Sequence, residues 1–96
     1  MCRVVHCNKE EYDIYIGRPS KWGNPFTHIS TKETLADFIV DSREEAIESY
    51  RQWILFGDGR YLMKDICELR GKTLGCWCHP NSCHGDVLCQ IVSDYC

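Results

Sequence analysis

The stretch of sequence that decides the fold is Lys72-Thr73-Leu74-Gly75-Cys76-Trp77-Cys78-His79-Pro80-Asn81-Ser82-Cys83-His84-Gly85-Asp86. Residues 72–78 are predicted to form a strand, and residues 80–82 a turn. Cys83 or Ser82 is then expected to cap a helix. The apolar residues of that helix recur at helical spacing: Val87, Leu88, Ile91 and Val92. A strand that leads through a tight turn into a helix is typical of an α/β domain.

Two more strands are predicted near the start of the chain. Residues 3–7 form a short β-branched run, and residues 12–16 form a second run that ends at Gly17. The polar turn between them, residues 8–11, suggests that these two strands form a hairpin. The strand at 72–78 is expected to pair in parallel with the first strand, because the chain between them is long and helical.

The middle of the chain predicts helices. Residues 42–45 match a capping box, with Ser42 as the N-cap, and the helix that follows is expected to end at the glycines Gly57 and Gly59. A second helix is predicted over residues 60–70, with Gly71 as its C-terminal stop. Residues 34–40 are compatible with a further short helix.

Together these elements predict one compact α/β domain over residues 1–96, in the order β-β-loop-α-α-β-α. A small, partly parallel sheet would carry helices packed on it. The composition is globular, with 44% hydrophobic and 26% charged residues. The sequence contains no internal repeat and no linker, so any functional site is expected on one face of one sheet or between subunits.

Charge and cysteine content narrow the classes of function. The net charge is −3 and no basic stripe is present, which argues against non-specific binding of duplex nucleic acid. The apolar runs are too short for a membrane span, and the first residues lack the apolar stretch of a signal peptide. We therefore expect a cytoplasmic protein whose partner is a small ligand, a nucleotide or another protein. The eight cysteines are then expected to be reduced, with four disulfides as the alternative.

The cysteine–histidine loop, residues 75–86, is the first candidate site. A strand, a tight turn and a helix N-terminus would present backbone N–H groups to an anion, and Gly85 would allow close approach. His84 would donate a hydrogen bond, and Trp77 would stack on a base if it faces outward. Asp86 would repel phosphate unless it binds ribose hydroxyls or caps the helix.

Two other readings of the same loop stay open. Cys76, Cys78, Cys83 and His84 offer the ligand types of a zinc site or of an iron–sulfur cluster, although their spacing is not that of a finger, ribbon or knuckle. Because the adjacent Cys83 and His84 rarely both reach one metal, His79, His6 or Cys7 are alternative ligands. Alternatively, Cys83 would be a nucleophile with a pKa lowered by the helix N-terminus, with His84 or His79 as base and Asp86 beside them. The structural alternative is that the cysteines only fill the core.

The second candidate site is the tryptophan–glycine loop, residues 17–26. Arg18, Ser20 and Lys21 offer the cationic and hydroxyl donors that a phosphate or carboxylate needs. Trp22 and Phe26 would pin the loop to the core, and Trp22 is also a candidate ligand-binding residue. The remaining candidate ligand-binding residues of the loop are Gly23, for which a positive φ is expected, and Asn24. In the purely structural alternative, the charges of the loop are merely solvated.

The two loops together resemble a family of small domains of unknown function found in phages and bacteria. The likeness spans nearly the whole chain and rests on residues 15–26, 69–80 and 83–88. It implies phage-associated biology in the cytoplasm of a bacterial host cell, where the partner would be a nucleotide-like small molecule or a host protein, and it brings no activity with it. Our leading hypothesis is a nucleotide or nucleic-acid-derived ligand bound between the two loops, serving host takeover, anti-defence or nucleotide modification. A zinc-stabilised or iron–sulfur protein-interaction module and a thiol-dependent enzyme using Cys83 are the alternatives, so whether this chain is an enzyme stays open.

Overall fold

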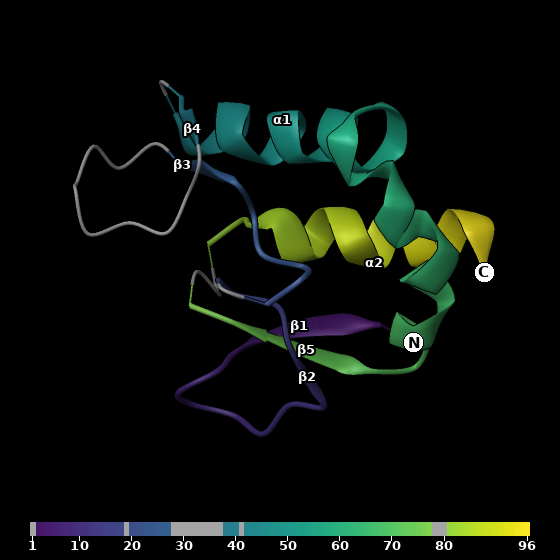
Figure 1. Ribbon diagram of the computed structural model, residues 1–96. Coiled ribbons are helices and arrows are strands. Elements are labelled where there is room, and N and C mark those ends of the chain that lie inside the picture. The colour runs from purple at the N-terminus through teal and green to yellow at the C-terminus, as the bar shows by residue number, and fades with distance from the viewer. Residues whose placement is uncertain (1, 19, 28–37, 41, 78–80) are drawn as a thin grey trace.

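The computed structural model describes residues 2–18, 20–27, 38–40, 42–77 and 81–96. Three strands form the main sheet: β1 (Arg3–His6), β2 (Ile14–Tyr15) and β5 (Thr73–Cys76). Their order is β1-β5-β2, and both pairings are parallel (Figure 1). The mixed α/β class and the parallel pairing of the first and last strands are thus confirmed. The predicted hairpin is wrong, because β5 lies between β1 and β2.

The chain segment between β1 and β2 explains why no hairpin forms. It runs along the face of the sheet opposite the helices and returns to the same end from which β1 started (Figure 1). Tyr12 in this segment packs over β5, where a Cβ atom on Gly75 would lie only 2.6 Å from the Tyr12 ring. Asp13 fixes the crossing to the start of β5: its carboxylate accepts from the Thr73 amide at 2.8 Å, and its own amide donates to the Thr73 carbonyl at 2.8 Å.

Helices cover the other face of the sheet. Helix α1 (Arg43–Phe56) begins where Ser42 Oγ accepts a hydrogen bond from the Glu45 amide at 3.0 Å, so the predicted N-cap is confirmed. The next segment, Asp58–Leu69, is a 3₁₀ helix, η1, rather than the predicted α-helix. It ends beside Gly71, whose φ of 74° confirms the expected stop. Helix α2 (His84–Tyr95) has Cys83 as its N-cap.

Two very short strands, β3 (Phe26–Thr27) and β4 (Phe38–Ile39), form a separate parallel pair. They lie beside the start of α1 (Figure 1). The short helix predicted over residues 34–40 is wrong at Phe38–Ile39, and residues 34–37 of that prediction lie outside the described residues. Aromatic and β-branched side chains favour the extended pairing here over a single helical turn.

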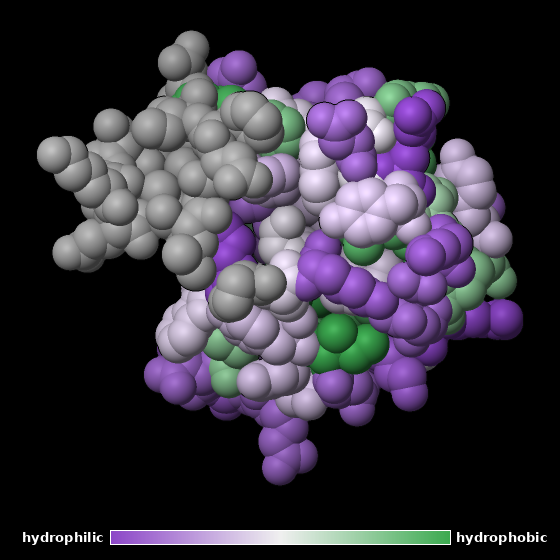
Figure 2. All heavy atoms as spheres, viewed as in Figure 1, coloured by the Kyte–Doolittle hydropathy of each residue, from purple (hydrophilic) through white to green (hydrophobic). Residues whose placement is uncertain are grey.

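The core lies between the sheet and the helices. Its fully buried members include Leu74 from β5, Tyr50 from α1 and Leu88 from α2. On the face shown in Figure 2, apolar residues form only small patches among hydrophilic ones. Cys67 and Cys96 form a disulfide, which corrects the expectation that all cysteines are reduced. None of the helices in the described residues is long and apolar enough to cross a membrane.

Candidate functional site

The candidate site lies at the carboxyl edge of the main sheet. Because all pairings in this sheet are parallel, β1, β2 and β5 end at the same edge, at His6, Tyr15 and Cys76. Ligands of parallel α/β sheets commonly bind outside the carboxyl ends of the strands. The tryptophan–glycine loop follows β2, and the cysteine–histidine loop contains the end of β5. The fold therefore brings together the two loops that the sequence analysis singled out.

Trp77, the first residue after β5, is an exposed ring held in a fixed position. Its side chain is 60% exposed. The indole Nε1–H donates to the Tyr15 hydroxyl at 2.8 Å, and the His6 ring meets the indole edge-on, with 5.6 Å between ring centroids and an interplanar angle of 85°. The outward orientation that base stacking requires is thus present. Tyr15 and His6 hold the ring from the two strands that flank β5.

The tryptophan–glycine loop is held by hydrogen bonds to its own backbone and to α1. Arg18 Nη1 donates to the Asn24 carbonyl at 3.0 Å, and Asn24 Nδ2 donates to the Ala46 carbonyl at 3.2 Å. The Tyr50 hydroxyl donates to the Trp22 carbonyl at 2.8 Å, and the Trp22 ring is buried. Trp22 therefore pins the loop to the core, as expected, and the Asn24 side chain links the loop to α1 through its hydrogen bond.

The loop glycine and serine have local roles. The expected positive φ at Gly23 is wrong, since Gly71 is the only residue with a positive φ in the part of the chain that the structure describes. The surroundings of Gly23 are crowded instead: a Cβ there would lie 3.0 Å from Arg18 Cγ and 3.1 Å from the Ser20 carbonyl oxygen, so a larger residue would have to displace these neighbours slightly. The Ser20 hydroxyl is buried and has no hydrogen-bond partner among the described residues.

Lys21 faces η1 rather than the sheet edge. Its Nζ lies 2.9 Å from a Glu68 carboxylate oxygen and 3.2 Å from one of Asp65. Hydrogen bonds to Glu68 and Asp65 raise the pKa of Lys21. The ammonium also lies 5.1 Å from the Trp22 ring centroid. Lys21 is thus already neutralised by two carboxylates, and Arg18 is the better candidate for holding an anion.

His84 joins the two loops from inside the protein. Its Nε2 lies 2.7 Å from the Ile16 carbonyl oxygen, which can only accept, so the neutral ring carries its proton on Nε2. The ring is buried edge-on against Tyr50, at 5.0 Å between centroids. The pKa of His84 is lowered to about 4, because burial and, to a smaller extent, the positive charge of Arg18 outweigh the hydrogen bond to Ile16 and the carboxylate of Asp86.

The start of α2 is occupied by its own cap. The Gly85 amide donates to Cys83 Sγ at 3.3 Å, and the Cys83 amide donates to Asp86 Oδ2 at 3.1 Å. Gly85 is needed for packing, because a Cβ there would lie 2.8 Å from side-chain atoms of Ile16 and Val4. Two of the backbone donors that were expected to hold an anion are therefore already bonded, and Asp86 is a capping residue.

Cys76 and Cys83 are brought together at the end of β5 and the start of α2. Their sulfur atoms lie 3.2 Å apart and share a hydrogen bond, and both side chains are buried. This hydrogen bond and burial raise the pKa of Cys83. The expected lowering of the Cys83 pKa is thus wrong, because contact with Cys76 outweighs the helix N-terminus.

The four residues predicted as metal ligands are not assembled in the described part of the chain. Cys76 and Cys83 adjoin, but Nε2 of His84 is committed to the Ile16 carbonyl, and Cys78 lies outside the described residues. No group of three or more His, Cys, Asp or Glu residues among those described is placed to hold a metal ion. Two sulfur ligands are half of a tetrahedral zinc site.

Tyr15 was missed by the sequence reasoning. It lies in β2, but its hydroxyl reaches across to Trp77 and also donates to the Arg18 carbonyl at 3.3 Å. The predicted hairpin would have placed the end of β2 at the opposite edge of the sheet, so Tyr15 is found only from the observed parallel pairing, in which strands end at one shared edge. His6, at the end of β1, follows from the same rule.

These features define a small parallel α/β domain whose candidate site is an aromatic cluster at the carboxyl edge of the sheet. Residues 3–94 match the family described as Domain of unknown function (DUF4326), and the chain belongs to that family. The family that the two loops indicated is thereby confirmed at the level of a small domain of unknown function with phage relatives.

Two viral proteins are similar to this chain. The "Uncharacterized 12.4 kDa protein in nrdA-td intergenic region" of Enterobacteria phage T4 is 34% identical over 95 residues, which cover 97% of this chain and 79% of that protein. The "Uncharacterized protein R718" of Acanthamoeba polyphaga mimivirus is 38% identical over 97 residues, which cover 82% of this chain and 65% of that protein. No solved structure matches this chain significantly.

Proposed function

We propose that this chain binds a nucleotide or a nucleic-acid-derived ligand at the carboxyl edge of the sheet. The base would stack on Trp77, and Arg18 would hold an anionic group. The single observation that carries the proposal is Trp77 itself, which is 60% exposed yet fixed by Tyr15 and His6. A rigid aromatic ring facing outward at this edge is the kind of platform on which bases stack.

The contacts of Trp77 specify which part of the ring is available. An indole has one N–H donor, and Tyr15 already accepts from it. Its flat face, rather than a hydrogen-bonding edge, is therefore what the ring offers to a ligand. Stacking on a face is tolerant of base identity, because every base has a π surface. We therefore expect modest discrimination among bases.

Arg18 supplies the positive charge near this platform. The Tyr15 hydroxyl contacts both the Arg18 carbonyl and the Trp77 indole, so the two residues are linked through one side chain. A guanidinium carries five N–H donors, and the bond to the Asn24 carbonyl uses one of them. Arg18 also acts electrostatically on His84 at the start of α2. Its geometry supports recognition of a phosphate or carboxylate.

The viral relatives give this proposal a biological setting. In a viral protein, binding of a nucleotide would sequester a signalling nucleotide of the host, counter host defence, or present a nucleotide for modification. The negative net charge fits a small ligand better than a long nucleic acid, because affinity for duplex DNA depends on many phosphate contacts. We accordingly propose a small-molecule site that acts inside the host cell.

The test is an NMR titration of ¹⁵N-labelled protein with a panel of nucleosides, nucleoside monophosphates and nucleoside triphosphates. The three tryptophans give separate indole signals, and Trp77→Phe identifies that of Trp77. We expect the Trp77 signal to move on titration while that of buried Trp22 stays in place. Trp77→Ala should weaken binding on the order of ten-fold, as loss of one stacked base does. Arg18→Gln should weaken binding of the phosphorylated ligands and leave the nucleosides unaffected.

The matched control is Tyr95→Ala, which removes an aromatic ring that is 64% exposed near the end of α2. This variant should bind the panel as the unaltered protein does. The proposal is abandoned if no member of the panel moves the Trp77 signal at millimolar concentration. It is equally abandoned if Trp77→Ala and Tyr95→Ala have the same effect.

A metal-bound protein-interaction module is the second candidate function. One observation favours it: two buried sulfur atoms, from Cys76 and Cys83, lie 3.2 Å apart. Elemental analysis of protein purified without a histidine tag is the test, because a structural metal would be retained through mild purification. Less than about half an equivalent of zinc or iron per chain would exclude a stable structural metal.

A further inference from the structure

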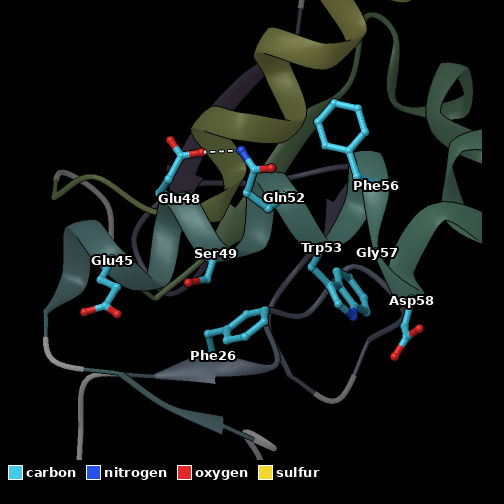
Figure 3. A pocket seen from close by; sticks show the side chains of 9 residues that line it. All are labelled: Phe26, Glu45, Glu48, Ser49, Gln52, Trp53, Phe56, Gly57 and Asp58. Atoms are coloured by element: carbon cyan, nitrogen blue, oxygen red, sulfur yellow. Dashed lines mark hydrogen bonds between the residues drawn. The ribbon is translucent and has the colours of Figure 1, made fainter.

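A groove along α1 lies away from the sheet edge and has a volume of about 570 Å³ (Figure 3). Phe26 and Trp53 lie side by side in it (Figure 3). Its Glu48 carboxylate accepts a hydrogen bond from the Gln52 amide at 3.1 Å and lies 3.6 Å from Nε of Arg51. Because this charge is already paired within the protein, it gives a ligand little to recognise.

A second hollow, which we call the thiol pocket, differs in this respect. It has a volume of about 580 Å³ and lies between the start of β1, the turn after η1 and one face of α2. Arg3 and Arg70 line it, and neither guanidinium is ion-paired within the described part of the chain. Asp86 lines it as well, but its carboxylate caps α2 by accepting from the Cys83 amide. Two cations against one side-chain carboxylate favour an anionic ligand.

Two free thiols line the same pocket. Cys2 and Cys89 are both half-buried. A hydrogen bond between them lowers the pKa of Cys2, against the effect of burial, and raises the pKa of Cys89, so the two sulfur atoms adjoin. A larger thiolate fraction speeds attack on a disulfide, which makes Cys2 the nucleophile of the pair. Cys96, the third cysteine of the pocket, is already bridged to Cys67.

The other free thiols of the described residues lack this combination. Cys76 and Cys83 adjoin, but both are buried, and contact with Cys76 raises the pKa of Cys83. Cys7 is half-buried like Cys2, but burial raises its pKa, and it does not line the thiol pocket. These thiols therefore serve as internal controls for any reaction at Cys2.

We propose that the thiol pocket is a thiol–disulfide exchange site for an anionic low-molecular-weight disulfide, with Cys2 as nucleophile and Cys89 as resolving thiol. Arg3 and Arg70 would hold carboxylates of this substrate. The Cys2 sulfur attacks one sulfur of the substrate, the S–S bond of the substrate breaks, and one half leaves as a thiol with the proton that Cys2 gives up. Cys89 then attacks the Cys2 sulfur and releases the second half as a thiol. The protein dithiol is oxidised to a Cys2–Cys89 disulfide, and the substrate is reduced to two thiols.

The test exposes the folded protein, with its Cys67–Cys96 disulfide intact, to glutathione disulfide. Intact-mass spectrometry and peptide mapping follow the reaction. We expect the protein to lose two hydrogen atoms and the map to place the new bridge between Cys2 and Cys89. Cys89→Ser should stop at the first step and retain one glutathione on Cys2, because the resolving thiol is gone.

Charge variants test the anionic part of the substrate. Arg3→Gln/Arg70→Gln should react about five-fold more slowly with glutathione disulfide and at an unchanged rate with the uncharged hydroxyethyl disulfide. The matched control is Arg60→Gln/Lys64→Gln, which removes the same number of cations from exposed positions of η1 outside the thiol pocket. This control should react with glutathione disulfide as the unaltered protein does.

Three results would overturn the proposal. One is equal slowing in both double variants, which would reduce the effect to overall charge. Another is a Cys89→Ser protein that takes glutathione on Cys7 or Cys83 at least as fast as on Cys2. The third is the absence of any mixed disulfide on Cys2 in that variant. Since Trp77 and Arg18 are untouched, these outcomes are separate from those of the nucleotide test.

Discussion

Acid sensitivity caused by the buried imidazole of His84 is the sharpest expectation of this structure. In the folded protein, burial lowers its pKa to about 4, whereas the ordinary value is 6.5. A base with a lowered pKa binds fewer protons when folded than when unfolded, so the free energy of unfolding rises with pH in this range. The stabilisation is complete above pH 6.5 and is lost as the pH falls towards 4.

The magnitude follows from the two pKa values. Each pKa unit corresponds to about 1.4 kcal/mol, so the full effect is on the order of 3 kcal/mol. Integration over pH gives losses of about 0.8 kcal/mol at pH 6, about 2 kcal/mol at pH 5 and about 3 kcal/mol at pH 4. For a domain of this size, whose total stability is on the order of 5–10 kcal/mol, such a loss is large.

The assay compares the unaltered protein with His84→Gln in urea at pH 7, 6 and 5. The glutamine amide offers an N–H donor near the Ile16 carbonyl but does not titrate. Carboxylates titrate in both proteins, so the difference between the two free energies of unfolding isolates the histidine. This difference should shrink by about 2 kcal/mol from pH 7 to pH 5. A difference that stays constant over this range would show that His84 does not carry the lowered pKa, and the argument from burial would be refuted.

Two further contacts lead to stability predictions. Tyr50→Phe leaves the Trp22 carbonyl without its hydroxyl donor, so the free energy of unfolding should fall by about 1–2 kcal/mol in urea, and an unchanged value would contradict the role of Tyr50 in anchoring the loop. Reduction of the Cys67–Cys96 disulfide, which joins positions 29 residues apart, should lower the free energy of unfolding by about 3–4 kcal/mol. Cys67→Ser should reproduce that loss and should make the protein insensitive to reductant.

Local signals in the sequence were sufficient for the elements that depend on neighbouring residues. The N-cap of α1 at Ser42 and the stop at Gly71 were both predicted and are confirmed, because a cap or a positive φ is decided within a few residues. The predicted hairpin failed for the opposite reason. Residues 8–11 can form a turn, but the partner of β1 is decided by the packing of Tyr12 over Gly75, and those residues lie far apart in the sequence.

In the candidate site, too, some features could be predicted from local sequence and others depended on contacts between distant residues. The sequence correctly singled out the two loops that meet at the sheet edge, because their residue types are unusual. It could not show which of their polar groups the fold itself would use. Lys21 is paired with carboxylates of η1, and His84 is bonded to the Ile16 carbonyl. Both were candidate ligand groups, and both have partners inside the protein.

Whether a polar group already has a partner within the protein also separates the residues that build the site from those that would contact a ligand. A polar group that is buried and already bonded would have to break that bond to bind anything, at a cost of about 1–3 kcal/mol. When a ligand stacks on a ring that is exposed and already held in place, no hydrogen bond has to break and no side chain has to be ordered, so the free-energy cost of binding is lower. By this criterion His84 supports the structure, and Lys21, although exposed, is already paired with two carboxylates, whereas Trp77 is the most available of these three candidate groups. The function of this domain should therefore be sought at its exposed tryptophan rather than at its buried thiols.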